Sequence, residues 1–175
     1  MRIIAGTLGG RLFNSPHGHR THPMSDKMRG ALFNMLGDIE GLTVLDPFAG
    51  SGALAFEAAS RGAASVVAID QDRNAQRTIG ENIELLGVDD TVKLVKANAY
   101  GWLRTSKEVF DIVLLDPPYD RLQYDLLELL VHRVAKGGTV ILSWPGKYDR
   151  MPQFTNLTLT TTKHYGDSSL YVYTG

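Results

Sequence analysis

Residues 44–59 read VLDPFAGSGALAFEAA, and the order of residue types in this segment sets the architecture that we expect for the whole chain. Apolar residues lead up to Asp46, glycines follow at positions 50 and 52, and an alanine-rich segment comes next. This order predicts a β-strand, a glycine turn and a helix, the unit that repeats in parallel α/β sheets. Ligands of such sheets bind beyond the carboxyl ends of the strands, so Asp46, Gly50 and Gly52 are candidates for a ligand site.

The rest of the chain continues this alternation. We expect strands at LTVLD, SVVAID, TVKLV, DIVLLD and GTVILSW, and helices at residues 53–61, 73–86, 99–103 and 123–134. Strand and helix in strict alternation indicate right-handed βαβ units and a mostly parallel sheet with helices on both faces. The last two apolar runs, FTNLTLTTT and SSLYVYT, are separated only by KHYGD, which predicts an antiparallel hairpin at the edge of the sheet.

An appendage of residues 1–37 precedes the core at residues 38–175. RIIAGTLGGRLFNSP alternates around its glycines, as a β-hairpin does. Ser25 can cap a following helix whose apolar residues recur at helical spacing, and Gly37 is a plausible stop. With 175 residues and 43% hydrophobic side chains, the chain is long enough for one core and too short for two full-sized domains, so we expect a single domain.

The composition argues against several classes of protein. There is no cysteine, so nothing indicates a disulfide framework or a thiolate metal site, and a reducing compartment is expected. No run approaches the ~18 apolar residues of a membrane helix, and the first residues lack a signal-peptide core. The histidines of PHGHRTH have no companion carboxylate, which favours a polar loop over a metal site. We therefore expect a soluble cytoplasmic monomer without a metal.

Positive charge gathers at the amino terminus. Residues 1–29 carry five Lys and Arg against one Asp, a balance of +4, so the remaining 146 residues carry −5 of the net −1. A basic arm on an acidic body is typical of a protein that binds a polyanion. A solvated basic face with no ligand is the alternative, and charge alone does not separate the two.

A second acid ends the next predicted strand, 24 residues after Asp46. Asp70 stands where an acid accepts hydrogen bonds from both ribose hydroxyls of a nucleoside cofactor. The turn before it is neither the dinucleotide fingerprint, since positions 48 and 55 are Phe and Ala, nor a P-loop. Asp46 would repel a pyrophosphate, so a phosphate-free nucleoside with an ammonium or sulfonium charge fits better than NAD. The alternative is a tight turn followed by a helix cap at Asp70.

DPFAGSGAL with an acid after the next strand resembles the S-adenosylmethionine-dependent methyltransferases that have a Rossmann-like, seven-stranded sheet. In that family the turn wraps the methionine part of the cofactor. The resemblance therefore implies S-adenosyl-L-methionine as the cofactor. It also implies a set of contacts: Asp46, Phe48, Gly50 and Gly52 beside the amino-acid and sulfonium portion, Asp70 at the ribose, and Asn98 and Ala99 of KANAY at the adenine, although many relatives have Asp in place of Asn98. Gln71, next to Asp70, is a further candidate for a cofactor contact.

The motif LLDPPY at residues 114–119 resembles that of methyltransferases that modify planar exocyclic nitrogens. Such an NH₂ is a poor nucleophile because its lone pair is delocalised. Asp116 and the carbonyl of Pro117 could accept its two N–H bonds and turn the lone pair toward the sulfonium methyl, while Pro117 and Pro118 restrict the backbone. Tyr119 offers a ring on which an extruded base can stack. The alternative is a strand that ends in a proline turn.

Nearly end to end, the chain resembles the RsmD-type small-subunit ribosomal RNA guanine-N2 methyltransferases. RIIAGTLGGR resembles their opening hairpin, THPMSDKMRGALFNML their helix, and KHYGDSSLYVY their closing part. The resemblance implies methylation of a guanine N2 in 16S ribosomal RNA. The modest basic cluster suits RNA presented within an assembled or assembling small subunit, because a single domain of this size would not open a duplex by itself. Family members usually have Arg-Pro-Thr in place of His22, Pro23 and Met24, and often Arg in place of Lys27.

On a base-modifying enzyme, the basic arm would supply phosphate contacts. The candidates are Arg11, Arg20, Lys27 and Arg29, the last of them either there or paired internally with a carboxylate. Two other functions stay open. DPPY also occurs in adenine-N6 and cytosine-N4 methyltransferases, and a non-catalytic RNA-binding ribosome-assembly factor could keep the same fold. Acids at three strand ends argue against a non-catalytic module.

Overall fold

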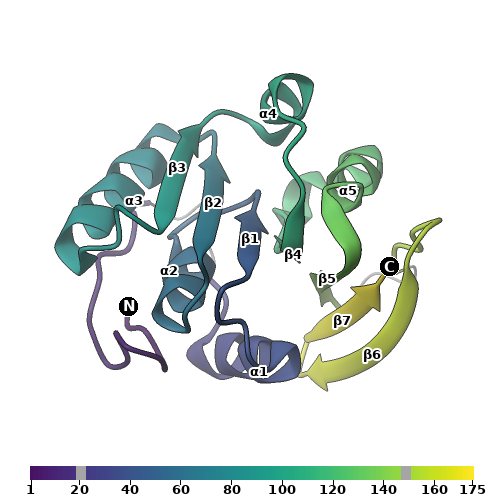
Figure 1. Cartoon of the computed structure of the whole chain (residues 1–175), viewed down its shortest axis with the longest axis horizontal. Coiled ribbons are helices and arrows are strands. Elements are labelled where there is room, and N and C mark those ends of the chain that lie inside the picture. The colour runs from purple at the N-terminus through teal and green to yellow at the C-terminus, as the bar shows by residue number, and fades with distance from the viewer. Residues whose placement is uncertain (19–22, 147–150) are drawn as a thin grey trace.

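The computed structural model describes residues 1–18, 23–146 and 151–175, and these residues form a sheet of seven strands with helices on both faces (Figure 1). The helices are α1 (Asp26–Leu36), α2 (Ala53–Ser60), α3 (Arg73–Leu86), α4 (Ala99–Thr105) and α5 (Tyr124–Val131), with a short 3-10 helix η1 (Tyr119–Arg121). The strands are β1 (Thr43–Asp46), β2 (Ser65–Asp70), β3 (Val92–Lys96), β4 (Phe110–Leu115), β5 (Val134–Pro145), β6 (Thr158–Tyr165) and β7 (Ser168–Thr174).

The strand order is β3-β2-β1-β4-β5-β7-β6. The strands from β3 to β5 are parallel neighbours, and β7 is antiparallel to both β5 and β6. The predicted parallel sheet and its antiparallel carboxyl-terminal hairpin are therefore confirmed. After β3 the chain returns to the other side of β1, so the order of strands reverses between β1 and β4. Open α/β sheets bind ligands at such a reversal, beyond the carboxyl ends of the strands.

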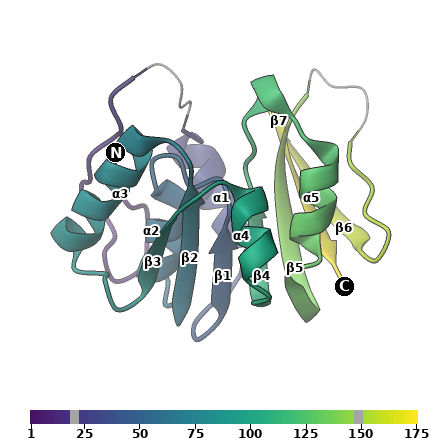
Figure 2. The same ribbon diagram turned by 90° about the horizontal axis from the view of Figure 1, so that it is seen from above.

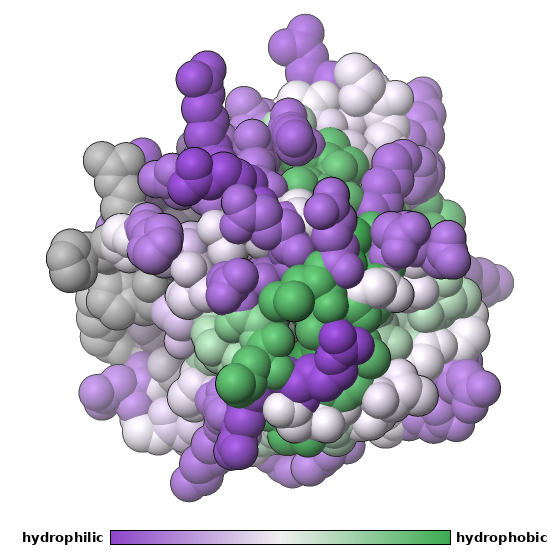
Figure 3. Space-filling model, turned by 90° about the vertical axis from the view of Figure 1, so that its left-hand side faces the viewer, coloured by the Kyte–Doolittle hydropathy of each residue, from purple (hydrophilic) through white to green (hydrophobic). Residues whose placement is uncertain are grey.

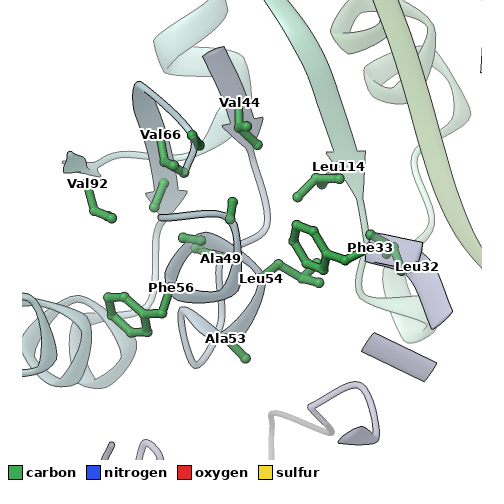
Figure 4. Close-up of a cluster of buried hydrophobic side chains, with 14 of the residues drawn as sticks. Leu32, Phe33, Val44, Ala49, Ala53, Leu54, Phe56, Val66, Val92 and Leu114 are labelled. Carbon is green, nitrogen blue, oxygen red and sulfur yellow. The ribbon is translucent and has the colours of Figure 1, made fainter. Parts of the chain in front are cut away.

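Alternating side chains of the central strands enter two hydrophobic clusters, one on each face of the sheet. Val44 and Leu114 join residues of α1, α2 and α3 in the first cluster, where Phe33, Leu54 and Leu114 lie together (Figure 4). The second cluster lies between the opposite face and helices α4 and α5. Figure 2 shows α4 and α5 in front of the strands and α1 behind them. The two layers hold the carboxyl ends of the strands in fixed positions.

The amino-terminal hairpin was predicted more regular than it is. The segment reverses direction, but residues 1–18 contain one isolated antiparallel bridge, Arg2 to Leu12, and no extended strand. Some amides bond across the two arms, as the N–H of Ile3 does to the carbonyl of Arg11 at 2.9 Å, whereas the N–H groups of Ile4 and Ala5 donate to the Glu57 carboxylate of α2 at 2.8 and 3.1 Å. Because α2 takes the donors at Ile4 and Ala5, the pairing between the two arms stays short.

Two other boundaries test the local predictions. Ser25 caps α1 as expected, since its hydroxyl accepts a hydrogen bond from the N–H of Met28 at 3.2 Å. The helix predicted to end at residue 134 ends at Val131, because Val134 already pairs with Phe110 as the first residue of β5. Sheet pairing with a residue far away in the sequence therefore ended this helix early.

Candidate active site

The glycine turn after β1 adopts backbone conformations that other residues rarely take. Gly50 and Gly52 have φ angles of 54° and 80°. A Cβ atom on Gly52 would lie 2.6 Å from the ring of Phe56, so a side chain there would collide with the helix that follows. Glycine is therefore required at position 52 by both backbone strain and packing. The turn leaves its amides beside the end of β1.

Asp70, at the end of β2, reaches across to this turn. One carboxylate oxygen accepts the N–H of Gly50 at 2.8 Å and the other accepts the N–H of Asp72 at 2.8 Å. Asp72, and not Asp70, caps helix α3 through the N–H groups of Asn74 and Ala75. The helix-cap alternative for Asp70 is therefore wrong. Its carboxylate is fixed in orientation and still has lone pairs for a further donor.

Asp46 is fully buried, and neither of its oxygens accepts a well-formed hydrogen bond from the described residues. The pKa of Asp46 is raised to about 8, first by burial and then by the charges of Asp116 and Asp70, while the amides of Phe48 and Ala55 oppose the rise. Buried polar groups normally have a partner. A ligand with a cationic group fits this carboxylate, and the ammonium of an amino-acid moiety has that charge.

Asp116 follows β4 at the same edge of the sheet. Burial is the main cause that raises the pKa of Asp116, and hydrogen bonds from Ser143 and Tyr119 oppose the rise. Tyr119 was predicted to present its ring to a base. Its hydroxyl donates to Oδ1 of Asp116 at 3.0 Å and is also hydrogen-bonded to the Ser143 hydroxyl. Pro117 is buried and Pro118 is exposed, so the motif bends the chain out of the sheet directly after the acid.

The remaining candidates for cofactor contacts lie at the same edge. Asn98 follows β3 and caps α4, since its Oδ1 accepts the N–H of Gly101 at 2.7 Å. Ala99 is the first residue of that helix, and Gln71 is exposed directly after β2. Phe48 is half-buried against the second hydrophobic cluster. The parallel topology therefore brings the ends of β1, β2, β3 and β4 to one side of the sheet.

A cavity of about 400 Å³ opens next to Asp116. Its volume lies within the range of about 300–1,000 Å³ typical of small-molecule sites. It is lined by the start of α1, by the β6–β7 turn and by the end of β5: Pro23, Met24, Ser25, Lys27, Met28, Asp116, Tyr119, Ser143, Tyr165, Gly166 and Ser168. Ser143 and the β6–β7 turn were missed by sequence reasoning. The sequence holds one signal for Ser143, which is a polar residue near the end of GTVILSW, the strand predicted directly after DIVLLD.

The basic candidates for RNA contacts separate in the structure. Lys27 is exposed and lines the cavity. The Arg11 guanidinium instead donates to the carbonyls of Leu85 and Leu86, at 3.0 and 3.2 Å, where α3 ends. Helix α3 starts beside Asp70 and runs back along the sheet, so Arg11 lies toward the opposite edge from Asp116. The phosphate contact predicted at Arg11 stays a prediction, and the bonds to α3 give this side chain a structural role that competes with it. Figure 3 shows the side with α3 and the amino-terminal segment, where apolar surface lies among polar side chains.

Arg29 does not fit as a phosphate contact, because its side chain is fully buried. Its guanidinium lies 3.1 Å from Asp26 and 3.7 Å from Glu57, which is itself buried and is paired with Arg61 at 2.8 Å. The alternative of an internal ion pair is the correct one for Arg29. Arg29 and Arg61 together offset the charge of the buried Glu57, so Arg29 links α1 to α2 inside the core. Arg20 lies outside the described residues.

The described ranges also bear on metals and membranes. His17 is exposed, whereas His19 and His22 lie outside these ranges. Within them, no group of three or more His, Asp or Glu side chains is arranged to hold a metal ion. Nor does any helix there have the length and apolar character needed to cross a membrane.

The structure has the features of a Rossmann-like methyltransferase fold: the strand order reverses beside β1, a glycine turn follows β1, and acids lie at the ends of β1, β2 and β4. Solved structures agree with this assignment. The protein yhhF from Escherichia coli has a TM-score of 0.87 and 30% identity, covering 99% of this chain and 97% of its own. A hypothetical protein from Thermus thermophilus has a TM-score of 0.83 and 29% identity, covering 98% of both chains.

Sequence comparisons identify the protein family within the methyltransferases. The family described as "Conserved hypothetical protein 95" matches residues 1–174. Ribosomal RNA small subunit methyltransferase D of Escherichia coli K12 is 35% identical over 139 residues, 79% of this chain and 68% of that protein. The protein of the same name from Buchnera aphidicola subsp. Acyrthosiphon pisum is 34% identical over 119 residues, which cover 67% of this chain and 62% of that protein. This chain therefore belongs to the RsmD family.

Proposed function

We propose that this protein transfers a methyl group from S-adenosylmethionine to the exocyclic N2 amino group of a guanine in small-subunit (16S) ribosomal RNA. The observation that supports this most directly is the proximity of Asp46 and Asp116. They end neighbouring strands, and the charge of Asp116 acts on the pKa of Asp46. A buried acid suited to a cationic cofactor therefore lies next to the acid of the DPPY motif, which a cavity exposes to an incoming base.

Each acid has a separate task in this proposal. Asp46 pairs with the cofactor's ammonium, and Asp70, held by the amides of Gly50 and Asp72, accepts the ribose hydroxyls. When bound, S-adenosylmethionine supplies a sulfonium methyl: the N–C bond forms as the C–S bond breaks, and that electron pair goes to sulfur. Asp116 and the Pro117 carbonyl accept the two N–H bonds of the amine and turn its lone pair toward this methyl. The product nitrogen then loses one proton to Asp116 or to water.

The cavity beside Asp116 is the proposed site of the extruded base. Tyr119 of η1 and Tyr165 of β6 both line the cavity, and stacking on aromatic side chains is how enzymes commonly hold a flipped base. Lys27 at the rim is the proposed phosphate contact. The choice of ribosomal RNA follows the similarity to the small subunit methyltransferase D proteins.

The test uses ribosomal RNA from cells that lack this methylation. Naked 16S RNA and small subunits are incubated separately with the protein and isotope-labelled S-adenosylmethionine, and the digested nucleosides are analysed by mass spectrometry. We expect label in N2-methylguanosine, with more from particles than from naked RNA. Label in N6-methyladenosine or N4-methylcytidine would contradict the assigned base, and absence of label together with S-adenosylhomocysteine binding would favour an assembly factor.

A further inference from the structure

Ser143 lies next to Asp116 because of the register of β4 and β5. Leu115 pairs with Leu142, so Asp116 and Ser143 are the next residues along two parallel strands. Ser143 is only 3% exposed, yet it lines the same cavity as Asp116. From residue 140 to the end of β5 its neighbours are aliphatic, tryptophan or proline, so a hydroxyl at this position interrupts an otherwise apolar run.

The Tyr119 hydroxyl lies between these two residues. It donates to Oδ1 of Asp116 at 3.0 Å and is hydrogen-bonded to the Ser143 hydroxyl. In the proposed reaction Asp116 must accept an N–H of the substrate amine, and the phenol already occupies one of its oxygens. The phenol has one proton, so releasing Asp116 requires another acceptor. A buried hydroxyl without a partner would cost about 1–3 kcal/mol.

We propose that Ser143 is a positioning residue for methyl transfer: it accepts the Tyr119 hydroxyl when an amine enters and so frees Asp116 for the substrate. This role rests on the proposed function, since only an incoming amine competes with the phenol for Asp116. Ser143 acts in this proposal through Tyr119 and not on the substrate. It can do so without moving, because its hydroxyl is already in contact with the phenol. Its hydroxyl also makes a hydrogen bond that lowers the pKa of Asp116, and a direct action on that carboxylate is the alternative that the Tyr119→Phe background tests.

The experiment separates the hydroxyl from the shape of the side chain. Ser143→Thr and Ser143→Val have nearly the same shape, and only Thr has a hydroxyl. Each is made alone and together with Tyr119→Phe, which keeps the ring and removes the phenol. Single-turnover methylation gives the chemical rate, and calorimetry gives the affinity for S-adenosylhomocysteine.

We expect Ser143→Val to slow methyl transfer about 10-fold relative to Ser143→Thr, which is the rate effect of roughly one unsatisfied buried hydroxyl. Affinity for S-adenosylhomocysteine should be equal in the two variants. In the Tyr119→Phe background the difference between Val and Thr should fall below about 2-fold, because no phenol remains to be moved.

Other outcomes overturn the proposal. Equal rates for Val and Thr would remove any role of the hydroxyl, and a 10-fold difference that persists with Tyr119→Phe would show that Ser143 does not act through the phenol. Should the Val variant fail to fold, Ser143→Ala provides the same comparison with less bulk. A wild-type protein that binds S-adenosylhomocysteine but methylates no RNA would overturn both this role and the proposed function, whereas an active wild type with insensitive variants overturns this role alone.

Discussion

Asp116 acts electrostatically on Asp46 across the neighbouring strands β4 and β1: after burial, the charge of Asp116 is the largest cause that raises the pKa of Asp46 to about 8. Asp46 is therefore mostly protonated at neutral pH until a cationic ligand arrives. A cationic ligand relieves both the missing hydrogen bonds of Asp46 and the repulsion between the two acids. The affinity for a cationic ligand, the stability of the ligand-free protein and the pH dependence of both therefore depend on Asp46.

The affinity for S-adenosylhomocysteine should increase with pH. Asp46 holds a proton below pH 8 and must lose it to pair with the ligand's ammonium, so we expect affinity to rise by about 10-fold from pH 6.5 to 7.5 and to level off near pH 8. Calorimetry in two buffers of different ionisation enthalpy should detect release of about one proton per ligand at pH 7. Asp46→Asn should bind weakly and show neither the slope nor the proton release. A flat profile in the wild type would refute the assignment.

Removal of Asp116 should separate its two effects. Asp116→Ala removes an acceptor for the amine, so we expect methyl transfer to fall by about 100-fold or more, measured with ribosomal RNA under single-turnover conditions. The same change removes a repulsive charge, so the pH midpoint for S-adenosylhomocysteine binding should shift below that of the wild type. Asp116→Asn keeps one acceptor oxygen and should retain more activity than Ala. Unchanged turnover in Asp116→Ala would exclude Asp116 from the mechanism.

The Asp46 carboxylate should make the ligand-free protein less stable at high pH. The folded-state pKa of Asp46 lies above the unfolded value of 3.8, so its contribution to stability is lost as pH rises toward 8. We expect Asp46→Asn to increase the free energy of unfolding by about 1 kcal/mol or more at pH 8, and by little at pH 4. Urea denaturation at the two pH values checks this. A gain of the same size at both pH values would mean that charge is not the cause.

The sheet and the three acids were predictable because both follow from local patterns. Apolar periodicity located the strands, and parallel topology brings their carboxyl ends together whichever residues lie between. Asp46, Asp70 and Asp116 could therefore be grouped before their distances were known. The positive φ angles of Gly50 and Gly52 follow in the same way from a strand that turns directly into a helix.

The partners of individual side chains were not predictable, because they depend on contacts between distant segments. Arg11 bonds to carbonyls 74 and 75 residues away, and Ser143 meets Tyr119 through the register of two strands. The sequence does contain one signal for the internal ion pair of Arg29. Glu57 stands in an otherwise apolar helix segment, ALAFEAAS, and a carboxylate that must be buried requires a buried cation. Charged residues inside apolar helices are therefore a guide to internal ion pairs.

Lys27 and Arg11 give a matched pair of exposed basic residues for locating the RNA-binding surface. Lys27 lines the cavity at the catalytic edge, whereas the Arg11 guanidinium is bonded to the end of α3. Lys27→Ala should weaken binding of small-subunit RNA and reduce the slope of log affinity against log salt by about 1, as expected for one lost phosphate contact. Arg11→Ala should leave that slope unchanged and lower the free energy of unfolding by about 1 kcal/mol, since it removes bonds to the last carbonyls of a helix. Filter binding at several salt concentrations and urea denaturation measure the two effects. A lower salt slope in Arg11→Ala with an unchanged slope in Lys27→Ala would place the RNA on the opposite edge of the sheet and contradict the proposed cavity.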